Sequence, residues 1–250
     1  MVVSSGNPSS VGSAADSELS RVREYYAARD QDGLHRRYSP FNPGHLLGMQ
    51  QLERAMLAAI DREAAAPLAD LEILDVGCGD GWFLRRLASL GATRSRLHGV
   101  DAIEARVASS RAADGGLDVC LSDGAHLPFG DGRFDLIVQM MVLSSVLDGD
   151  KQRALAGEMS RVLAPNGVIL SYDFRIARDR ANTRAVRRRD LEALFPGFAC
   201  TARSVTLLPP LARALAPYSW ALCEMLSLLP VLRGHELAVL RRNGDAPRGN

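Results

Sequence analysis

Lysine is almost absent from this chain, and cysteine is scarce. Lys151 is the only lysine among 30 basic residues, a bias typical of a GC-rich genome rather than of one function. The four cysteines, Cys78, Cys120, Cys200 and Cys223, lie far apart, and no two form a C-x-x-C pair. This spacing predicts neither a zinc site nor a disulfide framework, so no metal is expected and a reducing cytoplasm is the simplest setting.

The sequence predicts neither a secretion signal nor a membrane span. Residues 1–17 are rich in serine, glycine and alanine, with no cationic start before an apolar stretch, which predicts a disordered tail rather than a signal peptide. The most apolar segment, residues 205–232, contains four prolines together with Arg213 and Glu224, which excludes a simple span. Net charge is +1, so no overall field draws the chain to nucleic acid or anionic lipid.

The most informative segment is residues 73–81, Ile-Leu-Asp-Val-Gly-Cys-Gly-Asp-Gly. Its apolar run predicts a strand buried on both faces, and its three glycines predict a tight turn that a ligand can approach, before a helix that starts near Trp82. A phosphate-binding P-loop is excluded because no Lys-Ser/Thr pair follows Gly81. A dinucleotide-binding loop is disfavoured because Trp82 stands where its third small residue is needed.

An acid, Asp75, immediately precedes this G-x-G-x-G loop, and the combination resembles the first motif of the class I methyltransferases, which use S-adenosylmethionine. Four later segments resemble further motifs of that family in the same order: Asp101 after a second strand, Asp123-Gly124-Ala125-His126-Leu127-Pro128-Phe129 after a third, Phe134-Asp135 opening a fourth, and Arg161-Val162-Leu163-Ala164-Pro165-Asn166-Gly167 before a fifth. Five motifs in order across residues 71–173 argue against a chance match.

The resemblance implies an α/β fold with a doubly wound, mostly parallel seven-stranded sheet and helices on both faces, and S-adenosyl-L-methionine as cofactor. Asp75 would accept from the cofactor's ammonium group, Asp101 from the ribose hydroxyls, and Asp123 and the following backbone would hold the adenine. The residues expected at the cofactor are Tyr38, Asp75, Gly77, Cys78, Gly79, Asp101, Ala102, Asp123, Gly124, Ala125 and Gln139.

The chain divides into four expected parts. Residues 1–17 are the tail, 18–66 a helical lid, 67–243 the cofactor-binding core with acceptor elements at 174–232, and 244–250 a flexible tail. By the same resemblance, Arg37 in the lid would meet the cofactor's carboxylate and Tyr38 its ribose or the acceptor. An ordinary surface connection at residues 36–45 is an equally weighted alternative.

Two segments bear on the acceptor. An arginine run, which matches anionic groups in bidentate fashion but more often forms a solvated surface, comprises Arg178, Arg180, Arg184, Arg187, Arg188 and Arg189. Aromatic residues are not interleaved with it, so nucleic acid is not the expected partner. We interpret residues 205–232 as the last helix of the sheet before a strand at 235–242; the alternative is that part of it lines a hydrophobic acceptor pocket or touches a membrane surface.

Methyl transfer requires in-line positioning of the acceptor, with a base when the acceptor is a hydroxyl. Similar small-molecule enzymes place a histidine after the fourth strand, where this chain has Ser144-Ser145. The remaining candidates for the base are His126, Asp173, His35 and His45. Asp173 is preferred because it ends a strand at the ligand-binding edge of an α/β sheet, with Tyr172 as an orienting hydroxyl.

The predicted function is methyl transfer to a small or medium organic acceptor, most simply a hydroxyl of a sugar or secondary metabolite. A nitrogen or sulfur acceptor, a non-catalytic cofactor-binding protein and a nicotinamide-dependent oxidoreductase remain as alternatives. The acceptor's identity and the oligomeric state are not encoded in any motif.

Overall fold

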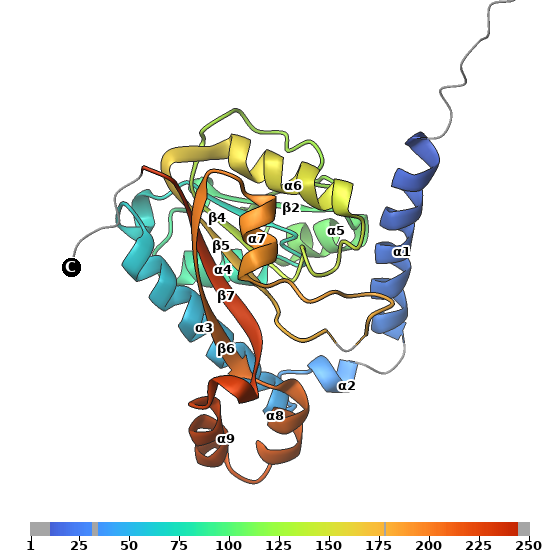
Figure 1. Cartoon of the computed structure of the whole chain (residues 1–250), viewed down its shortest axis with the longest axis vertical. Helices are drawn as coiled ribbons and strands as arrows, with labels where there is room; N and C mark the ends of the chain where they lie inside the picture. The colour runs from blue at the N-terminus through green and yellow to red at the C-terminus, as the bar shows by residue number, and fades with distance from the viewer. Residues whose placement is uncertain (1–10, 32–34, 178, 245–250) are drawn as a thin grey trace, which may run out of the picture.

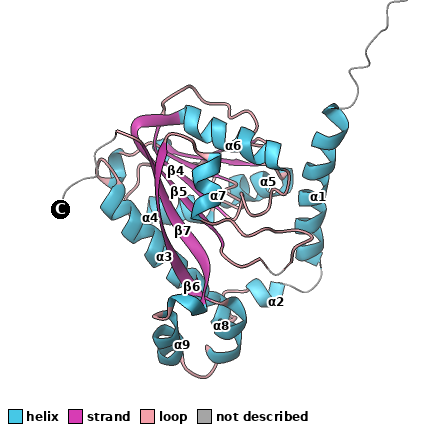
Figure 2. Cartoon of the chain, viewed as in Figure 1, coloured by secondary structure: helices cyan, strands magenta, loops and turns pink. Residues whose placement is uncertain are grey.

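The computed structural model describes residues 11–31, 35–177 and 179–244, and contains the predicted seven-stranded sheet (Figures 1 and 2). Its strands are β1 Ile73–Val76, β2 Leu97–Asp101, β3 Asp118–Leu121, β4 Phe134–Met140, β5 Leu163–Phe174, β6 Phe198–Leu207 and β7 Arg233–Arg242. They lie in the order β3-β2-β1-β4-β5-β7-β6, and β7 alone runs antiparallel to both of its neighbours. The carboxyl ends of β1 to β5 therefore meet at one edge of the sheet.

Helices cover both faces of the sheet (Figure 2). The helices of the described chain are α1 Val11–Gln31, α2 His35–Tyr38, α3 Pro43–Glu63, α4 Trp82–Ser89, α5 Glu104–Ala113, α6 Gly149–Val162, α7 Arg188–Leu194, α8 Pro209–Leu215 and α9 Trp220–Ser227. Helices α3, α4 and α5 share one core cluster with the sheet, and α6 and α7 share the other.

Strand β1 shows why the sequences of the central strands are almost continuously apolar. All four of its residues are buried. Ile73 packs in the α3/α4 core, whereas Leu74 and Val76 pack in the α6/α7 core, because successive side chains point to opposite faces. Burial on both faces leaves Asp75 as a charged residue in an apolar layer, which is the first structural sign of a site.

The end of the chain differs from the prediction. Residues 198–207 form β6, an edge strand whose mixture of small, polar and apolar residues gave no clear alternation, and its pairing with β7 sets its conformation. Residues 205–232 are therefore not one last helix of the sheet. They finish β6 and then form α8 and α9, which pack with Leu47 of α3 and Leu207 of β6 in a small third cluster.

The amino-terminal part also needs correction. Helix α1 starts at Val11, so residues 11–17 are helical rather than a disordered tail, and residues 1–10 lie outside the described part. The expected lid at 18–66 is divided: α1 stands at the carboxyl edge of the sheet, while α3 packs on a face of it (Figure 1). Of the tail expected at 244–250, residues 245–250 lie outside the described residues.

Candidate functional site

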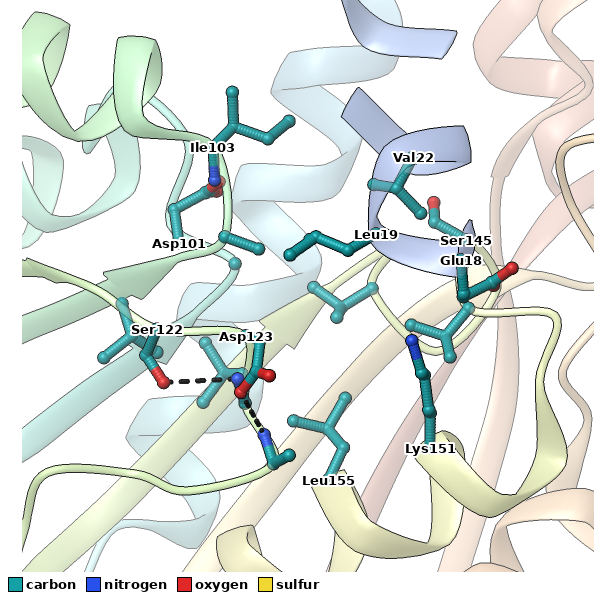
Figure 3. A pocket seen from close by; sticks show the side chains of 18 of the residues that line it. Glu18, Leu19, Val22, Asp101, Ile103, Ser122, Asp123, Ser145, Lys151 and Leu155 are labelled. Atoms are coloured by element: carbon teal, nitrogen blue, oxygen red, sulfur yellow. Dashed lines mark hydrogen bonds between the residues drawn. The ribbon is translucent and has the colours of Figure 1, made fainter. Parts of the chain in front are cut away.

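A cavity of about 300 Å³ lies at the carboxyl ends of β1, β2 and β4. Val76 ends β1 and Gly77 follows it, Asp101 ends β2, and Met140 ends β4, all on the wall of the cavity. The loop after β3 and helices α1, α5 and α6 complete the wall (Figure 3). Ligands bind at this edge in open α/β sheets, because the loops that follow parallel strands converge there.

The glycine loop forms the floor of this cavity. Gly77, Gly79 and Gly81 all have positive φ, at 72°, 58° and 76°, a region that L side chains rarely occupy. At Gly77 a Cβ would also run into the Val142 side chain. The loop is tied to β2, since the Gly77 and Cys78 amides both donate to the Val100 carbonyl at 2.7 and 3.0 Å.

Asp101 joins the glycine loop to the next helix. Its Oδ2 accepts from the Gly79 amide at 2.8 Å and its Oδ1 from the Ile103 amide at 2.9 Å. The side chain is buried yet lines the cavity, and each carboxylate oxygen keeps further lone-pair capacity toward it. This placement suits a group that accepts from vicinal hydroxyls.

The loop after β3 turns its backbone toward the same cavity. Ser122 Oγ accepts from the Gly124 amide at 3.2 Å and Asp123 Oδ1 from the Ala125 amide at 2.9 Å (Figure 3). These two turns hold Asp123, Gly124 and Ala125 on the wall, next to Leu155 of α6. The apolar contact with Leu155 and the polar turns beside it suit a planar heterocycle that carries hydrogen-bonding groups on its edge.

Asp75 lies beneath the glycine loop with both carboxylate oxygens buried and without a hydrogen-bond partner. Burial raises its pKa well above the usual aspartate range, and the nearby Asp101 and Asp80 charges act in the same direction. An unpartnered buried carboxylate is costly. A cationic ligand at Gly77, two residues along the chain, would relieve that cost, so the residues present fit a ligand with an ammonium group.

Helix α1 closes the cavity from above. Glu18 accepts from the Leu147 amide at 2.6 Å, and Arg21 donates to the Ser145 carbonyl at 2.6 Å. The Tyr26 hydroxyl lies 3.2 Å from Ser145 Oγ, and the Arg106 guanidinium stacks over the Tyr26 ring at 3.9 Å. One face of α1 therefore covers the cavity, in the region where a lid is expected (Figure 3).

The loop after β4, residues 141–147, is held from below by three buried polar side chains. Gln139 Oε1 accepts from the Val142 amide at 3.1 Å, Asp173 Oδ1 accepts from the Ser144 amide at 2.9 Å, and Gln152 Nε2 donates to the Leu143 carbonyl at 2.6 Å. Gln139 Nε2 and Ser171 Oγ both donate to the other oxygen of Asp173. Met141, with φ of 65°, carries the strain of this turn.

The predicted cofactor residues separate into two groups. Those on the wall of the cavity are Gly77, Asp101, Ala102, Asp123, Gly124 and Ala125. Asp75, Cys78 and Gly79 are not on that wall: Asp75 is buried in β1, the Cys78 thiol packs against Gly99 in the core, and Gly79 is held by Asp101. Gln139 is fully buried and serves the loop after β4, and Tyr38 lies at a different cavity.

None of the predicted catalytic side chains lies on the cavity wall. Asp173 is 1% exposed and its oxygens are occupied by the contacts just described; burial raises its pKa to about 6. Tyr172 is buried on the sheet, where its hydroxyl meets Thr206 Oγ1 at 3.1 Å and its ring stacks on His235. His126 is exposed on the loop after β3, outside the wall. Their places argue against the assigned base and orienting hydroxyl.

Of the other two candidate bases, His45 also lies outside this site. His45 is in α3 beside the Tyr38 ring, and the side chain of His35 lies outside the described part. Arg184, from the predicted arginine run, donates to Gln152 at 2.9 Å, and Arg188 pairs with Glu192 at 2.7 Å. The described arginines of that run line neither cavity, and Arg178 is not described.

Sequence reasoning missed the polar residues that α1 and α6 supply. Lys151 extends from the first turn of α6 into the cavity, opposite Glu18 (Figure 3). That turn is fixed by Asp148, whose side chain accepts from the Asp150 and Lys151 amides as an N-cap. The rarity of lysine in the chain was the one available signal for Lys151.

A second cavity, of about 410 Å³, lies further along the same edge of the sheet. Phe174 at the end of β5, Gly234 in β7 and Leu208 after β6 form its base. Since β4 and β5 are neighbours, the two cavities follow one another along the edge. Helix α1 contributes to both, with Tyr26 in the first and Tyr25 in the second.

The described residues contain no cluster of three metal-ligating side chains. Across the same residues, no helix has the length and apolarity needed to cross a bilayer.

Comparison with known proteins agrees with this geometry. The family described as "Methyltransferase domain" matches residues 74–171, which hold the glycine loop, Asp101, Asp123 and the loop after β4. The chain is 34% identical over 142 residues to a ubiquinone biosynthesis O-methyltransferase of Mesorhizobium japonicum, a match that covers 55% of this chain and 54% of that protein. The chain thus spans about half the length of the curated relatives it matches.

Solved structures share the fold. Geranyl diphosphate C-methyltransferase from Streptomyces coelicolor superposes with a TM-score of 0.62 at 14% identity, covering 94% of this chain and 98% of that one. The cyclase SpnF superposes with a TM-score of 0.58 at 21% identity, covering 77% and 82%. Because a protein named as a cyclase and one named as a methyltransferase share this fold, the fold alone does not identify the reaction. The matched domain with its motifs is informative for residues 74–171, which form a methyltransferase domain of the class I type, whose methyl donor is S-adenosylmethionine.

Proposed function

We propose that the chain transfers the methyl group of S-adenosylmethionine to a hydroxyl of a small or medium organic acceptor. The observation that carries this proposal is the cavity in which Gly77, Asp101 and Asp123 converge above the unpartnered carboxylate of Asp75. The choice of oxygen rests on the name of the relatives, O-methyltransferases that match this half of the chain at about one-third identity.

Each part of the cavity has a matching part of the donor. Asp75 fits its ammonium group, Asp101 its ribose hydroxyls, and the turns at Ser122 and Asp123 its adenine. When bound, the donor supplies an electrophilic methyl group on a sulfonium. The task of the chain is then to exclude water with α1 and to orient the acceptor, which is where most of the acceleration of a methyl transfer arises.

The second cavity supports an acceptor with an apolar or aromatic body and an acidic substituent. Tyr25, Tyr38 and Phe174 line it with rings, and Arg37 and Arg213 bring guanidinium groups to the same space. Guanidinium matches carboxylate and phosphate in bidentate fashion. Within the class of hydroxyl acceptors, this lining favours an acidic phenol-like secondary metabolite over a neutral sugar.

Calorimetry tests the donor assignment. Wild-type protein is expected to bind S-adenosylmethionine but neither NAD nor NADP, and Asp101→Ala is expected to weaken binding about tenfold because hydrogen bonds to a charged group are lost. Asp61→Ala, on the exposed surface of α3, is the matched control and should bind like the wild type. Wild-type binding of a nicotinamide nucleotide in place of S-adenosylmethionine would overturn the proposal.

A panel of acceptors tests the second part. Methyl transfer from labelled donor is expected with phenolic acids and not with neutral phenols or sugars of similar size. Arg213→Gln should raise KM for the acid about tenfold with little change in kcat, because the arginine binds the substituent and not the reacting oxygen. Arg153→Gln, exposed on α6, should change neither constant. Equal use of amines or thiols would instead favour nitrogen or sulfur transfer.

A further inference from the structure

Exposed apolar side chains are concentrated in one segment of the described chain. Of its twelve exposed large hydrophobic residues, seven lie between residues 218 and 231. We call this group the apolar tip: Tyr218, Trp220, Leu222, Met225, Leu228, Leu229 and Val231. Tyr218 is 88% exposed and Leu228 72% exposed, values unusual for side chains of this size.

The tip is an ordered part of the fold. Ala212, Ala216 and Cys223 point inward and pack with Leu47 and Leu207. Helix α8 also sits so close to α3 that a Cβ on Gly44 would run into its backbone. Leu211, Leu215, Leu226 and Leu232 also pack against this cluster, so the tip has an apolar inner face and, in its seven exposed side chains, an apolar outer face as well. The apolar outer face gives no benefit to the folded monomer in water.

The charges around the tip are predominantly positive. Between residues 209 and 232 the charged residues are Arg213 and Glu224, and Glu224 is already paired with Arg54 at 2.6 Å. At the base of the tip, Arg175 donates to the Pro230 carbonyl and Arg233 to the Ser227 carbonyl, each at 2.6 Å. These two guanidinium groups are satisfied by backbone oxygens, and their charge is not balanced by a carboxylate in the described ion pairs.

The tip projects beyond the end of the sheet (Figure 1). An exposed apolar surface with two aromatic side chains and a cationic base matches an anionic lipid surface in apolarity and charge. We propose that the apolar tip docks this protein on membranes that contain anionic phospholipid, lying on the surface without crossing it. This docking does not depend on the methyl-transfer proposal.

Sedimentation of the full chain with vesicles tests the docking. The wild type is expected to bind vesicles of phosphatidylcholine mixed with phosphatidylglycerol, to bind pure phosphatidylcholine more weakly, and to be released by added salt. Leu228→Asp should weaken binding about tenfold, because a charge replaces a side chain that would enter the lipid. Leu90→Asp is the matched control, since Leu90 is also exposed, at 41%, but ends α4 away from the tip.

Light scattering measures whether the protein is a monomer or a dimer, and thermal unfolding checks that both variants are folded. Both variants should unfold at the wild-type temperature, because both side chains are exposed. The proposal is overturned if the unmodified protein does not bind anionic vesicles, or if Leu228→Asp binds them like the control. It is also overturned if the tip instead joins two copies of the chain, seen as a dimer in the wild type that becomes a monomer in Leu228→Asp without any vesicle binding.

Discussion

Asp75→Asn is expected to stabilise the ligand-free protein while weakening its affinity for S-adenosylmethionine about a hundredfold. Stability and affinity change in opposite directions because the buried carboxylate destabilises the ligand-free protein, whereas in the complex it binds the ammonium group of the donor. Both carboxylate oxygens of Asp75 are buried without a hydrogen-bond donor. A purely structural aspartate would instead give a loss of stability on substitution.

The stability change follows from the raised pKa. Burial holds the folded-state pKa of Asp75 well above the unfolded value of about 3.9, so the wild type loses stability as the pH rises above that value. Asparagine at this position cannot ionise and therefore loses no stability in this way. The variant should be more stable than the wild type at pH 7, and the gain should vanish as the pH falls toward 4.

Chemical denaturation at several pH values measures the first effect, and calorimetry with the donor measures the second. Asp61→Asn, an exposed acid on α3, is the control and should alter neither quantity. If Asp75→Asn lowered the stability and left donor binding intact, the carboxylate would be part of the core rather than of the cofactor site.

The sequence predicted the lining of the first cavity better than that of the second, for a physical reason. Asp101 and Gly77 are placed by backbone alone: one ends a parallel strand, and the other follows the neighbouring strand into the same edge. Their positions need no knowledge of side-chain packing. Tyr25 and Arg213 meet only because α1 and α8, nearly 190 residues apart, fold onto the same end of the sheet, and no local pattern encodes that contact.

Asp173 and Gln139 show a different limit. Asp173 was expected at the ligand because it ends a strand, and Gln139 because of the family resemblance; both do lie near the carboxyl end of a strand. Neither side chain lines the cavity, because strand alternation fixes only which side chains share a face, and the loop after β4 folds over these two. One sequence feature hinted at this arrangement: Ser144-Ser145 stand where similar enzymes have a histidine. The Ser144 amide is the group that donates to Asp173.

Asp173→Ala is expected to lower the free energy of unfolding by about 3 kcal/mol or more. Three donors, the Ser144 amide, Gln139 Nε2 and Ser171 Oγ, lose their acceptor at once in a buried place, and each unsatisfied group costs about 1–3 kcal/mol. For a chain of this size the unfolding temperature should fall by about 6–12 °C. Asp61→Ala on the exposed surface should stay within about 0.5 kcal/mol of the wild type.

The pH dependence separates support of the loop from action as a base. The folded-state pKa of Asp173, about 6, lies above its unfolded value of about 3.9, so its contribution to stability is fully present below pH 4 and is lost as the pH rises through 6. Asp173→Asn should remove this slope from the stability profile and loosen donor binding, because residues 141–147 form part of the cavity wall. The pH at which kcat falls on the acidic side of its pH profile should be the same in Asp173→Asn as in the wild type. If Asp173→Asn instead kept stability and donor affinity while that fall in kcat disappeared, Asp173 would act directly on the acceptor's proton, and the loop-supporting role would be wrong.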